Sequence, residues 1–253
     1  MKVNIYSAEG EAVSEVELPS VFDSELREDL IKRAFRSISL SLRQPYGSYP
    51  HAGMRRVGHN IGPGHGIARL PRIEGGSRAV LLASFRGGKS AHSPRTDKIL
   101  LKRINKKERT KARNSALSMT KERDLVIQRG HKVPENVTLP VIVDDKIESF
   151  RKTRDAVTFL QKVGVYGDVE RAISGQKIRA GRGKARNRKY RVPRSILFVG
   201  SNQESLRPFS GITGVEIATV RSLSLRKLAP GGKGGRLTVF TKSALEQLRE
   251  VNE

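Results

Sequence analysis

Apolar and polar residues follow one another along the chain in short segments that predict an α/β protein. The runs LPVIV (139–143) and SILFVG (195–200) have the length and composition of buried strands. TRDAVTFLQKVG (153–164) and KSALEQLREV (242–251) have apolar residues at helical spacing, and Gly164 is a helix stop signal. Short strands that alternate with helices favour a mostly parallel sheet covered by helices on both faces, in a Rossmann-like three-layer fold.

The remaining periodic segments extend this pattern to both ends of the chain. KVNIY (2–6), VSEVEL (13–18), VEIATV (215–220) and RLTVF (236–240) predict further strands, and DVERAIS (168–174) predicts a short helix. A longer helix is predicted over residues 24–44, with Asp23 or Ser24 as its N-cap. Its expected inner face consists of Leu26, Leu30, Ala34, Phe35, Ile38 and Leu42. A very basic helix follows near residues 105–120, where Asn105 and Glu108 have the spacing of a capping box.

Residues 43–95 interrupt the periodic pattern. They contain ten Gly and five Pro, nine Lys or Arg, and Glu74 as their single acid. A segment of this length without its own secondary structure is either functional or disordered. Because it has few apolar groups to bury, we expect it to need a partner before it becomes ordered.

Charge identifies the class of that partner. The chain has 253 residues with 49 Lys plus Arg and 25 Asp plus Glu, a net charge of +24. A charge of this size disfavours the compact state unless a polyanion neutralises it, and nucleic acid is the commonest polyanion. The chain has no apolar run of membrane-spanning length and no signal-peptide core at its start, so we expect a cytoplasmic protein with no membrane partner. The absence of Cys excludes disulfides and thiol chemistry.

Residues 177–194 form the most basic tract, KIRAGRGKARNRKYRVPR, with nine Lys or Arg and no acid. Such tracts are usually solvated tails or address signals. This one lies directly before the SILFVG strand, which favours phosphate neutralisation by a tract held in a folded domain. Arg forks onto phosphate and stacks on bases, which suits folded RNA.

One enzyme hypothesis competes with this reading. Ala83, Gly88, Lys89 and Ser90 fit a relaxed phosphate-loop pattern, and Asp144 at the end of the LPVIV strand could hold magnesium. However, a helix must begin at Gly88-Lys89, and Pro94 would interrupt it. The alternative function is therefore a phosphate-loop nucleoside triphosphatase that acts on RNA.

Two other Gly-rich segments have less defined chemistry. IGPGHGIAR (61–69) and LAPGGKGGR (228–236) lack the spacing of a dinucleotide-binding turn. For the second segment, a tight turn and an RNA contact remain equally open. Four of the five His lie between residues 51 and 92 without carboxylate support, so we expect base contacts there rather than a metal or another cofactor.

Seven segments in order along the chain resemble the archaeal and eukaryotic branch of the universal large-subunit ribosomal protein four family. These are RQPYGSYPHAG (43–53), HGIARLPRIEGG (65–76), RGGKSAHSP (86–94), KERTKARNSALSMT (107–120), LVIQRGHKV (125–133), KIRAGRGKARNRKYR (177–191) and LAPGGKGGRLTVFTKSAL (228–245). The chain departs from the family pattern at RPFSGITG (207–214) and at Lys233. Without the C-terminal extension of eukaryotic members, it looks archaeal.

The resemblance implies a structural, RNA-binding protein of the large ribosomal subunit, present in one copy per ribosome, and not an enzyme. It implies an α/β domain, residues 1–42 and 96–253, that includes the tract 177–194, with an extended loop, residues 43–95, that reaches the peptide exit tunnel. Partners would be large-subunit rRNA, neighbouring proteins including protein twenty-two at the tunnel constriction, and the nascent chain. A free regulator that binds its own messenger RNA is a further alternative.

The resemblance also implies site residues. The rRNA contacts of the loop would be Arg43, Tyr46, Arg55, Arg56, His59, His65, Arg69, Arg72, Arg78, Arg86, Lys89, His92 and Arg95. The tip at the tunnel would comprise Arg55, Arg56, Gly62, Gly64, Gly66, Arg69 and Arg72. The basic tract would contribute Lys177, Arg179, Arg182, Lys184, Arg186, Arg188, Lys189, Tyr190, Arg191 and Arg194. Further contacts would come from Lys106, Lys107, Arg109, Lys111, Arg113, Lys233 and Arg236.

Overall fold

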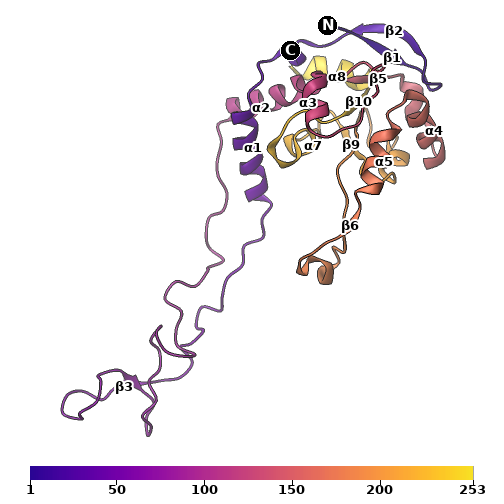
Figure 1. Cartoon of the computed structure of the whole chain (residues 1–253). Helices are drawn as coiled ribbons and strands as arrows, with labels where there is room; N and C mark the ends of the chain where they lie inside the picture. Colours follow the sequence, from indigo (N-terminus) through magenta and orange to yellow (C-terminus); the bar gives the residue numbers. More distant parts are fainter. Residues whose placement is uncertain (253) are drawn as a thin grey trace. The chain divides into compact units, whose positions relative to one another are not determined.

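A computed structural model describes residues 1–252 of the chain (Figure 1). Contacts divide it into two units. The first, which we call the sheet unit, comprises Met1–Ser39 and the chain from Lys102 onward; the second, the inserted unit, is Leu40–Leu101. Among the described residues, no helix has the length and apolar character needed to cross a bilayer.

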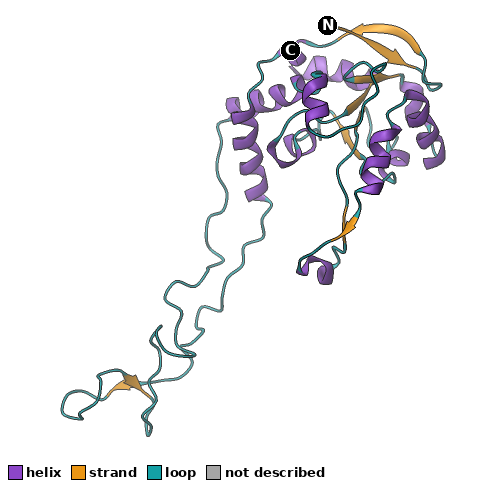
Figure 2. Cartoon of the chain, in the orientation of Figure 1, coloured by secondary structure: helices purple, strands orange, loops and turns teal. Residues whose placement is uncertain are grey.

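The sheet unit is built on one six-stranded sheet in the order β2-β1-β5-β10-β8-β9 (Figure 2). Only β1 and β2 pair in antiparallel fashion; the other four neighbouring pairs are parallel. The predicted mostly parallel α/β sheet is therefore confirmed, and the antiparallel pair at one edge makes it mixed. The strands are β1 Lys2–Tyr6, β2 Ala12–Glu17, β5 Val141–Val143, β8 Leu197–Gly200, β9 Glu216–Thr219 and β10 Thr238–Thr241.

Apolar residues alternate across the strands and build a core on each face of the sheet. Ile142 and Phe240 belong to one hydrophobic cluster, whereas Val141 and Val239 belong to the other. This alternation is the period-two pattern of a strand that is buried on both sides. The first cluster includes buried residues of α1 Glu28–Ser41, α2 Lys106–Ser118, α7 Leu225–Leu228 and α8 Lys242–Asn252. The second includes residues of α4 Thr153–Val163, α5 Tyr166–Ser174 and α6 Arg207–Ser210.

Two helix boundaries follow the local start and stop signals, and a third does not. The Asn105 side chain accepts a hydrogen bond from the Lys107 backbone N–H, so the predicted cap of α2 is confirmed. Gly164 ends α4 in the left-handed conformation, as predicted. The predicted start of α1 is wrong: Asp23 ends a 3₁₀ turn, Ser20–Asp23, and α1 begins only at Glu28. Leu26 and Leu42 consequently lie outside α1 and are exposed.

A short helix that the pattern did not predict, α3 Arg123–Gln128, contributes to both cores. Val126 is buried in the second cluster, and Leu125 packs against the first. Its six residues include only three apolar ones, so no helical periodicity could be recognised.

The inserted unit contains little regular structure. Its one described hairpin pairs β3 His59–Asn60 with β4 Pro71–Arg72. Val80 is the single buried residue between positions 42 and 101, all of which the structure describes. Because it buries so little apolar surface, this unit gains little free energy to offset the entropy that is lost when it becomes ordered.

Candidate nucleic-acid interface

Residues 177–194, hereafter the basic arm, form a hairpin. β6 Lys177–Ile178 pairs antiparallel with β7 Tyr190–Arg191, and a 3₁₀ turn, Arg182–Arg186, lies between them. Arg179 is half-buried and donates from Nε to the carbonyl of Arg188 at 3.0 Å, which closes the hairpin. The other cations of the hairpin that were predicted to bind RNA, in its strands and in the loop between them, are exposed and form no ion pair among the described residues. They are Lys177, Arg182, Lys184, Arg186, Arg188, Lys189 and Arg191.

The arm leaves the sheet unit and returns to it at one place. A Cβ on Gly175, just before the arm, would lie 2.7 Å from Cγ of Pro193, just before its end. Only Gly allows the two chain segments to come this close. The arm is therefore a loop closed at its base, with both of its ends fixed.

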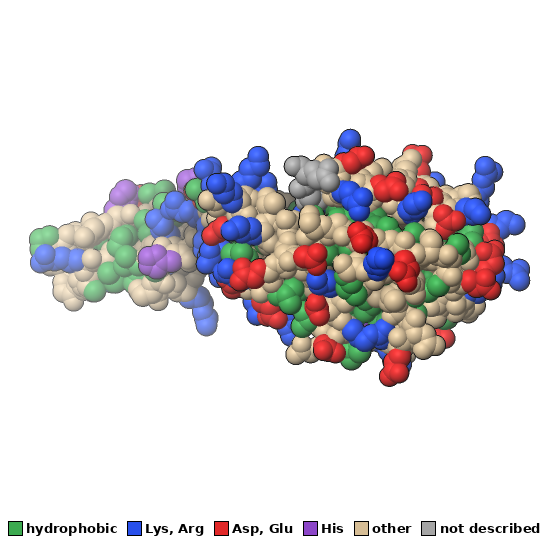
Figure 3. Space-filling model, turned by 90° about the horizontal axis from the view of Figure 1, so that it is seen from above, with side chains coloured by type: hydrophobic (Ala, Val, Ile, Leu, Met, Phe, Trp, Pro, Cys, Tyr) green, Lys and Arg blue, Asp and Glu red, His purple; other side chains and the backbone are tan. Residues whose placement is uncertain are grey.

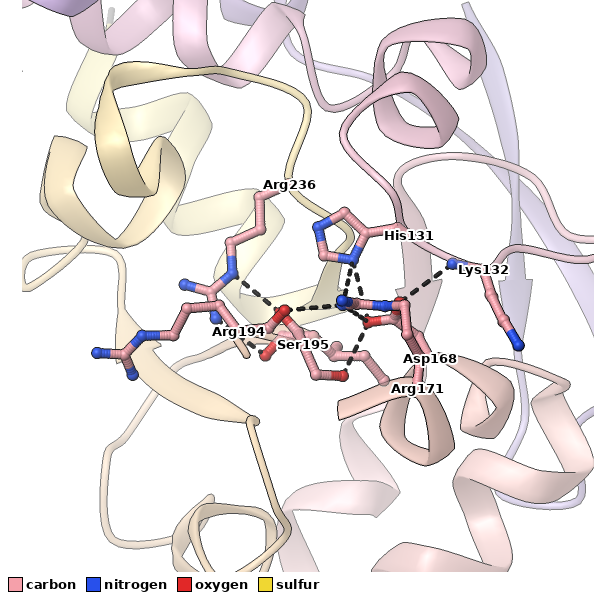
Figure 4. A network of polar contacts seen from close by, with 8 residues as sticks. His131, Lys132, Asp168, Arg171, Arg194, Ser195 and Arg236 are labelled. Atoms are coloured by element: carbon pink, nitrogen blue, oxygen red, sulfur yellow. Dashed lines mark hydrogen bonds and ion pairs between the residues drawn. The ribbon is translucent and has the colours of Figure 1, made fainter. Parts of the chain in front are cut away.

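A buried carboxylate holds the base of the arm. Asp168 of α5 is fully buried and accepts five hydrogen bonds (Figure 4). The donors are Nδ1 of His131 at 3.0 Å, the Lys132 backbone N–H at 3.1 Å, Nε and Nη2 of Arg171 at 2.8 and 3.3 Å, and Oγ of Ser195 at 2.8 Å. Arg171 also donates to the carbonyl of Arg194 at 2.8 Å. The carboxylate thus ties the end of the arm to α5 and to the chain after α3.

Burial and hydrogen bonding act in opposite directions on this carboxyl group. Burial by itself raises the pKa of Asp168, but the bonds from His131 and Arg171 outweigh it, so the pKa lies below the usual range. For His131, burial is the largest influence and lowers its pKa, although the bond to Asp168 opposes it. A neutral His131 then carries its proton on Nδ1, since Asp168 accepts there.

This cluster contains Ser, His and Asp, but it is not arranged for catalysis. Ser195 Oγ donates to Asp168 rather than to the imidazole, and the hydroxyl is buried. A nucleophilic serine needs a base within hydrogen-bonding reach and access to substrate. The cluster is a structural element at the base of the arm.

Arg236, one of the residues predicted to contact RNA, is bound at the base of the arm by a second acid, Glu216. Arg236 is fully buried; its Nε donates to the carbonyl of Ser195 at 3.0 Å, and Nη1 to the carbonyl of Lys227 at 2.7 Å and to Glu216. We therefore correct the prediction that Arg236 contacts RNA, because its guanidinium is buried and donates its hydrogen bonds to other groups of the protein. Arg194 also forms an ion pair with Glu216, although it remains exposed.

The Gly-rich segment 228–236 packs against the protein itself. A Cβ on Gly234 would collide with Sδ of Met119, and one on Gly235 would lie 2.8 Å from the Leu125 carbonyl oxygen. Arg129 donates to the carbonyls of Pro230, at 2.7 Å, and Gly234, at 3.0 Å. Burial, together with the nearby charges of Arg236 and Arg171, lowers the pKa of Arg129 to about 10. The sequence left a tight turn and an RNA contact equally open for this segment. The structure adds a third reason for Gly234 and Gly235, which is close packing against Met119 and Leu125, and Lys233 is exposed beside them.

Three glycines of the inserted unit are different. Gly62, Gly64 and Gly66 have φ of 84°, 94° and 64°, and a Cβ on any of them would meet nothing within 4 Å. Arg72 is half-buried and donates to the carbonyls of Ser77 and Ala68 inside the unit. The other predicted side chains of this unit are exposed: Arg43, Tyr46, Arg55, Arg56, His59, His65, Arg69, Arg78, Arg86, Lys89, His92 and Arg95.

Helix α2 presents a third set of cations. Lys106, Lys107, Arg109 and Lys111 are exposed. Arg113 is half-buried, its Nη2 donates to the Val220 carbonyl at 3.3 Å, and burial lowers its pKa. Four cations of α2 are therefore accessible to a polyanion, and the fifth is partly engaged within the sheet unit.

Acidic and basic side chains are distributed unevenly. Arg, Lys, Asp and Glu are mixed on the face of the sheet unit that Figure 3 shows. In contrast, the basic arm has no acid, and residues 43–95 have only Glu74. The two segments that lack an apolar core thus carry a strong, uncompensated positive charge, which is the electrostatic pattern of a nucleic-acid-binding surface.

The structure does not support the phosphate-loop alternative. No helix begins at Gly88-Lys89, and residues 79–85 form no strand. Asp144 accepts from the Asp145 backbone N–H and caps a 3₁₀ turn, Asp145–Ser149. Without a strand–loop–helix unit, the backbone amides that cradle phosphate cannot converge. Among the described residues, no group of three or more His, Asp or Glu could hold a metal ion.

Comparison with known proteins identifies the family to which this chain is similar. The model of a family described as "Ribosomal protein L4/L1 family" matches residues 16–251. The chain is 57% identical over 251 residues to the large ribosomal subunit protein uL4 of Thermoplasma volcanium, covering 99% of this chain and 98% of the relative. It is 56% identical over 252 residues to uL4 of Thermoplasma acidophilum (100% and 99% covered), and 48% identical over 251 residues to uL4 of Methanocaldococcus jannaschii (99% of both).

Proposed function

Because this chain belongs to the ribosomal protein L4/L1 family, we propose that it is a structural component of the large ribosomal subunit that binds and organises rRNA. A ribosomal structural protein of this family is not an enzyme. The relatives at 48–57% identity are archaeal and match along nearly their whole length, as the resemblance implied. The observation that carries the RNA-binding part is the unpaired positive charge of the basic arm and the inserted unit.

The two basic segments have different tasks in this proposal. The basic arm is a closed hairpin whose base is fixed by Asp168, so its cations are preorganised for phosphate. The inserted unit has one buried residue, and RNA supplies the contacts that its own sequence lacks. Its open glycines, Gly62, Gly64 and Gly66, let the backbone pass through narrow gaps beside RNA.

The inserted unit also accounts for the tunnel-related part of the proposal. By family resemblance, residues 55–72 reach the wall of the peptide exit tunnel near protein twenty-two and approach the nascent chain. A photoreactive residue placed in a stalled nascent chain tests this. Crosslinks to this segment are expected from nascent-chain positions at one restricted distance from the peptidyl-transferase end; their absence at all positions contradicts the tunnel contact.

Sedimentation tests the main proposal. A lysate is centrifuged through a high-salt sucrose gradient, and the fractions are probed for this protein. We expect it in the large-subunit peak at one copy per particle, because many phosphate contacts and a threaded segment resist salt extraction. Recovery at the top of the gradient would contradict an integral ribosomal role and favour a free regulator of messenger RNA.

A further inference from the structure

The inserted unit encloses a cavity between two of its chain segments. Twelve residues from the segments 48–52 and 89–97, all of them except His51 and Pro94, line a cavity of about 790 Å³. This volume lies within the range of ~300–1,000 Å³ that is typical of small-molecule sites. Side chains that could recognise a ligand are Tyr49, Lys89, Ser90, His92, Arg95 and Asp97.

Contacts at both ends of the cavity show that the two segments are held together on either side of it. At one end, the Ser48 backbone N–H donates to the Pro94 carbonyl at 3.0 Å, and a Cβ on Gly47 would lie 2.6 Å from that oxygen. At the other end, Gly53 has φ of 78°, and a Cβ there would collide with the backbone of Gly88 and Lys89. Glycine therefore closes the cavity at each end, and the segments separate between these contacts.

The lining carries the groups that recognise a nucleotide. Lys89 and Arg95 are exposed cations without an ion pair among the described residues, and either can neutralise a phosphate. Tyr49 and His92 are rings on which an unstacked base can lie. Asp97 is the one acid of the lining, and a carboxylate accepts hydrogen bonds from a base amino group.

Tyr49 lines a second cavity as well. This second cavity has a volume of about 440 Å³, and its lining includes Tyr49, Ala52, Arg55 and Arg56. The Arg55 guanidinium carbon is 5.1 Å from the centroid of the Tyr49 ring, as in a cation–π pair. The His51 ring also contacts Tyr49 in an edge arrangement, with the ring centroids 5.7 Å apart. A ligand in the first cavity would therefore meet Tyr49 within a cluster that already contains a cation and a second ring.

We propose that this cavity takes one unpaired nucleotide of RNA, with its base stacked on Tyr49 and its phosphate bound by Lys89 or Arg95. The inference rests on the proposed RNA-binding function and makes it more specific. Cations alone would favour any duplex, whereas a cavity with an aromatic wall favours a base that has left its helix. The same chemistry would suit a free nucleotide, so the test must separate the two sources.

The experiment uses the full chain and three RNA hairpins that differ at one position. One is fully paired, one has a single bulged 2-aminopurine, and one has an abasic bulge. We expect affinity for the bulged hairpin to exceed that for the paired one by at least about 5-fold, the low end for one base stacked on an aromatic ring. The 2-aminopurine fluorescence reports the environment of the bulged base, and the abasic hairpin should lose the preference.

Variants assign the preference to the cavity. Tyr49→Ala and His92→Ala should each reduce the ratio of bulged to paired affinity toward one, and Tyr49→Phe should preserve it. Tyr46→Ala is the matched control, because Tyr46 is an exposed aromatic of the same unit that does not line this cavity. It should weaken binding of both hairpins alike and leave their ratio unchanged.

Several results would overturn the inference. Equal affinity for the bulged and the paired hairpin would do so. A preference for the bulged hairpin that survives in both alanine variants would show that the cavity does not cause it. If the abasic hairpin is also preferred over the paired one, the protein recognises phosphate alone. Saturable binding of AMP that abolishes the bulge preference would assign the cavity to a free nucleotide instead. Each can occur while the protein still sediments with the large subunit, so failure here differs from failure of the proposed function.

Discussion

Replacing Asp168 by Asn should destabilise the sheet unit severely. The substitution keeps the shape of the side chain but removes the negative charge to which His131, Arg171 and Ser195 donate hydrogen bonds. The amide has one acceptor oxygen in place of two, and its NH₂ group faces donors. Arg171 then loses the one acid with which it forms an ion pair among the described residues, at 2.8 Å in a site where the carboxylate is fully buried.

The expected loss can be bounded from these contacts. Removing one partner of a buried ion pair costs about 3–5 kcal/mol, because the other charge stays behind without compensation. A domain has only ~5–15 kcal/mol of total stability, so the loss is a large share of it. With a urea m-value of about 2 kcal/mol per M, the unfolding midpoint should fall by roughly 1.5–2.5 M.

Urea unfolding followed by circular dichroism at pH 7 measures this change. Asp124→Asn is the matched control: Asp124 is exposed in the first turn of α3, so its loss should change stability by no more than about 0.5 kcal/mol. Hydrogen exchange adds a local readout, since the Arg179 N–H bonded to the Lys189 carbonyl should lose protection as the base of the arm loosens. A loss below about 1 kcal/mol for Asp168→Asn would refute the view that this carboxylate fixes the arm.

Four further predictions address the other features. Replacing Arg182, Arg186, Arg188 and Arg191 with Ala should flatten the log–log salt dependence of RNA binding by about 0.7 per lost phosphate contact, whereas the same change at Lys146, Arg151, Arg154 and Lys162 should not; equal slopes for the two sets would contradict an RNA-binding arm. Deleting residues 55–86 should leave a cooperatively folded sheet unit that still binds rRNA, as circular dichroism and filter binding can show, because those residues belong to a separate unit. Gly234→Ala should cost about 1–3 kcal/mol through its clash with Met119, whereas Gly181→Ala, which meets nothing within 4 Å, should be nearly neutral in the same urea assay. Stability should fall as pH decreases below about 6.5, where unfolded His takes up a proton that buried His131, with its lowered pKa, resists; the decline should be shallower in His131→Gln.

The regular part of the fold could be predicted because its signals are local. Buried parallel strands such as β8 are apolar throughout, and α4 has both an apolar stripe and a glycine stop. The start of α1 was predicted wrongly because Asp23 and Ser24 are good caps by composition. A 3₁₀ turn over Ser20–Asp23, whose Phe22 is fully buried, occupies that position instead. Tertiary burial of one aromatic residue outweighed a local capping preference.

The candidate interface was harder to predict, because sequence does not distinguish the uses of arginine. Arg182 and Arg236 have the same chemistry and lie in similar Gly-rich surroundings, yet one is exposed and the other fully buried. What separates them is contact with distant acids and carbonyls: Glu216 and the Ser195 carbonyl bind Arg236, and both are remote along the chain. For the same reason the sequence did not predict the contact between Asp168 and His131, which lie far apart along the chain.

The buried cations and the exposed ones depend on each other. A hairpin with seven unpaired cations repels itself, so its ordered shape must be maintained from its base. Asp168 and Glu216 supply two buried or half-buried negative charges there, and they engage Arg171, Arg194 and Arg236. Arg171, Arg194 and Arg236 thus form ion pairs at the base of the arm. In the proposed RNA-binding function, an arm that is ordered in advance loses less entropy when phosphate binds. Between residues 43 and 95 Glu74 is the single acid, so under the same proposal the ordering of the cations of the inserted unit would depend more heavily on the RNA.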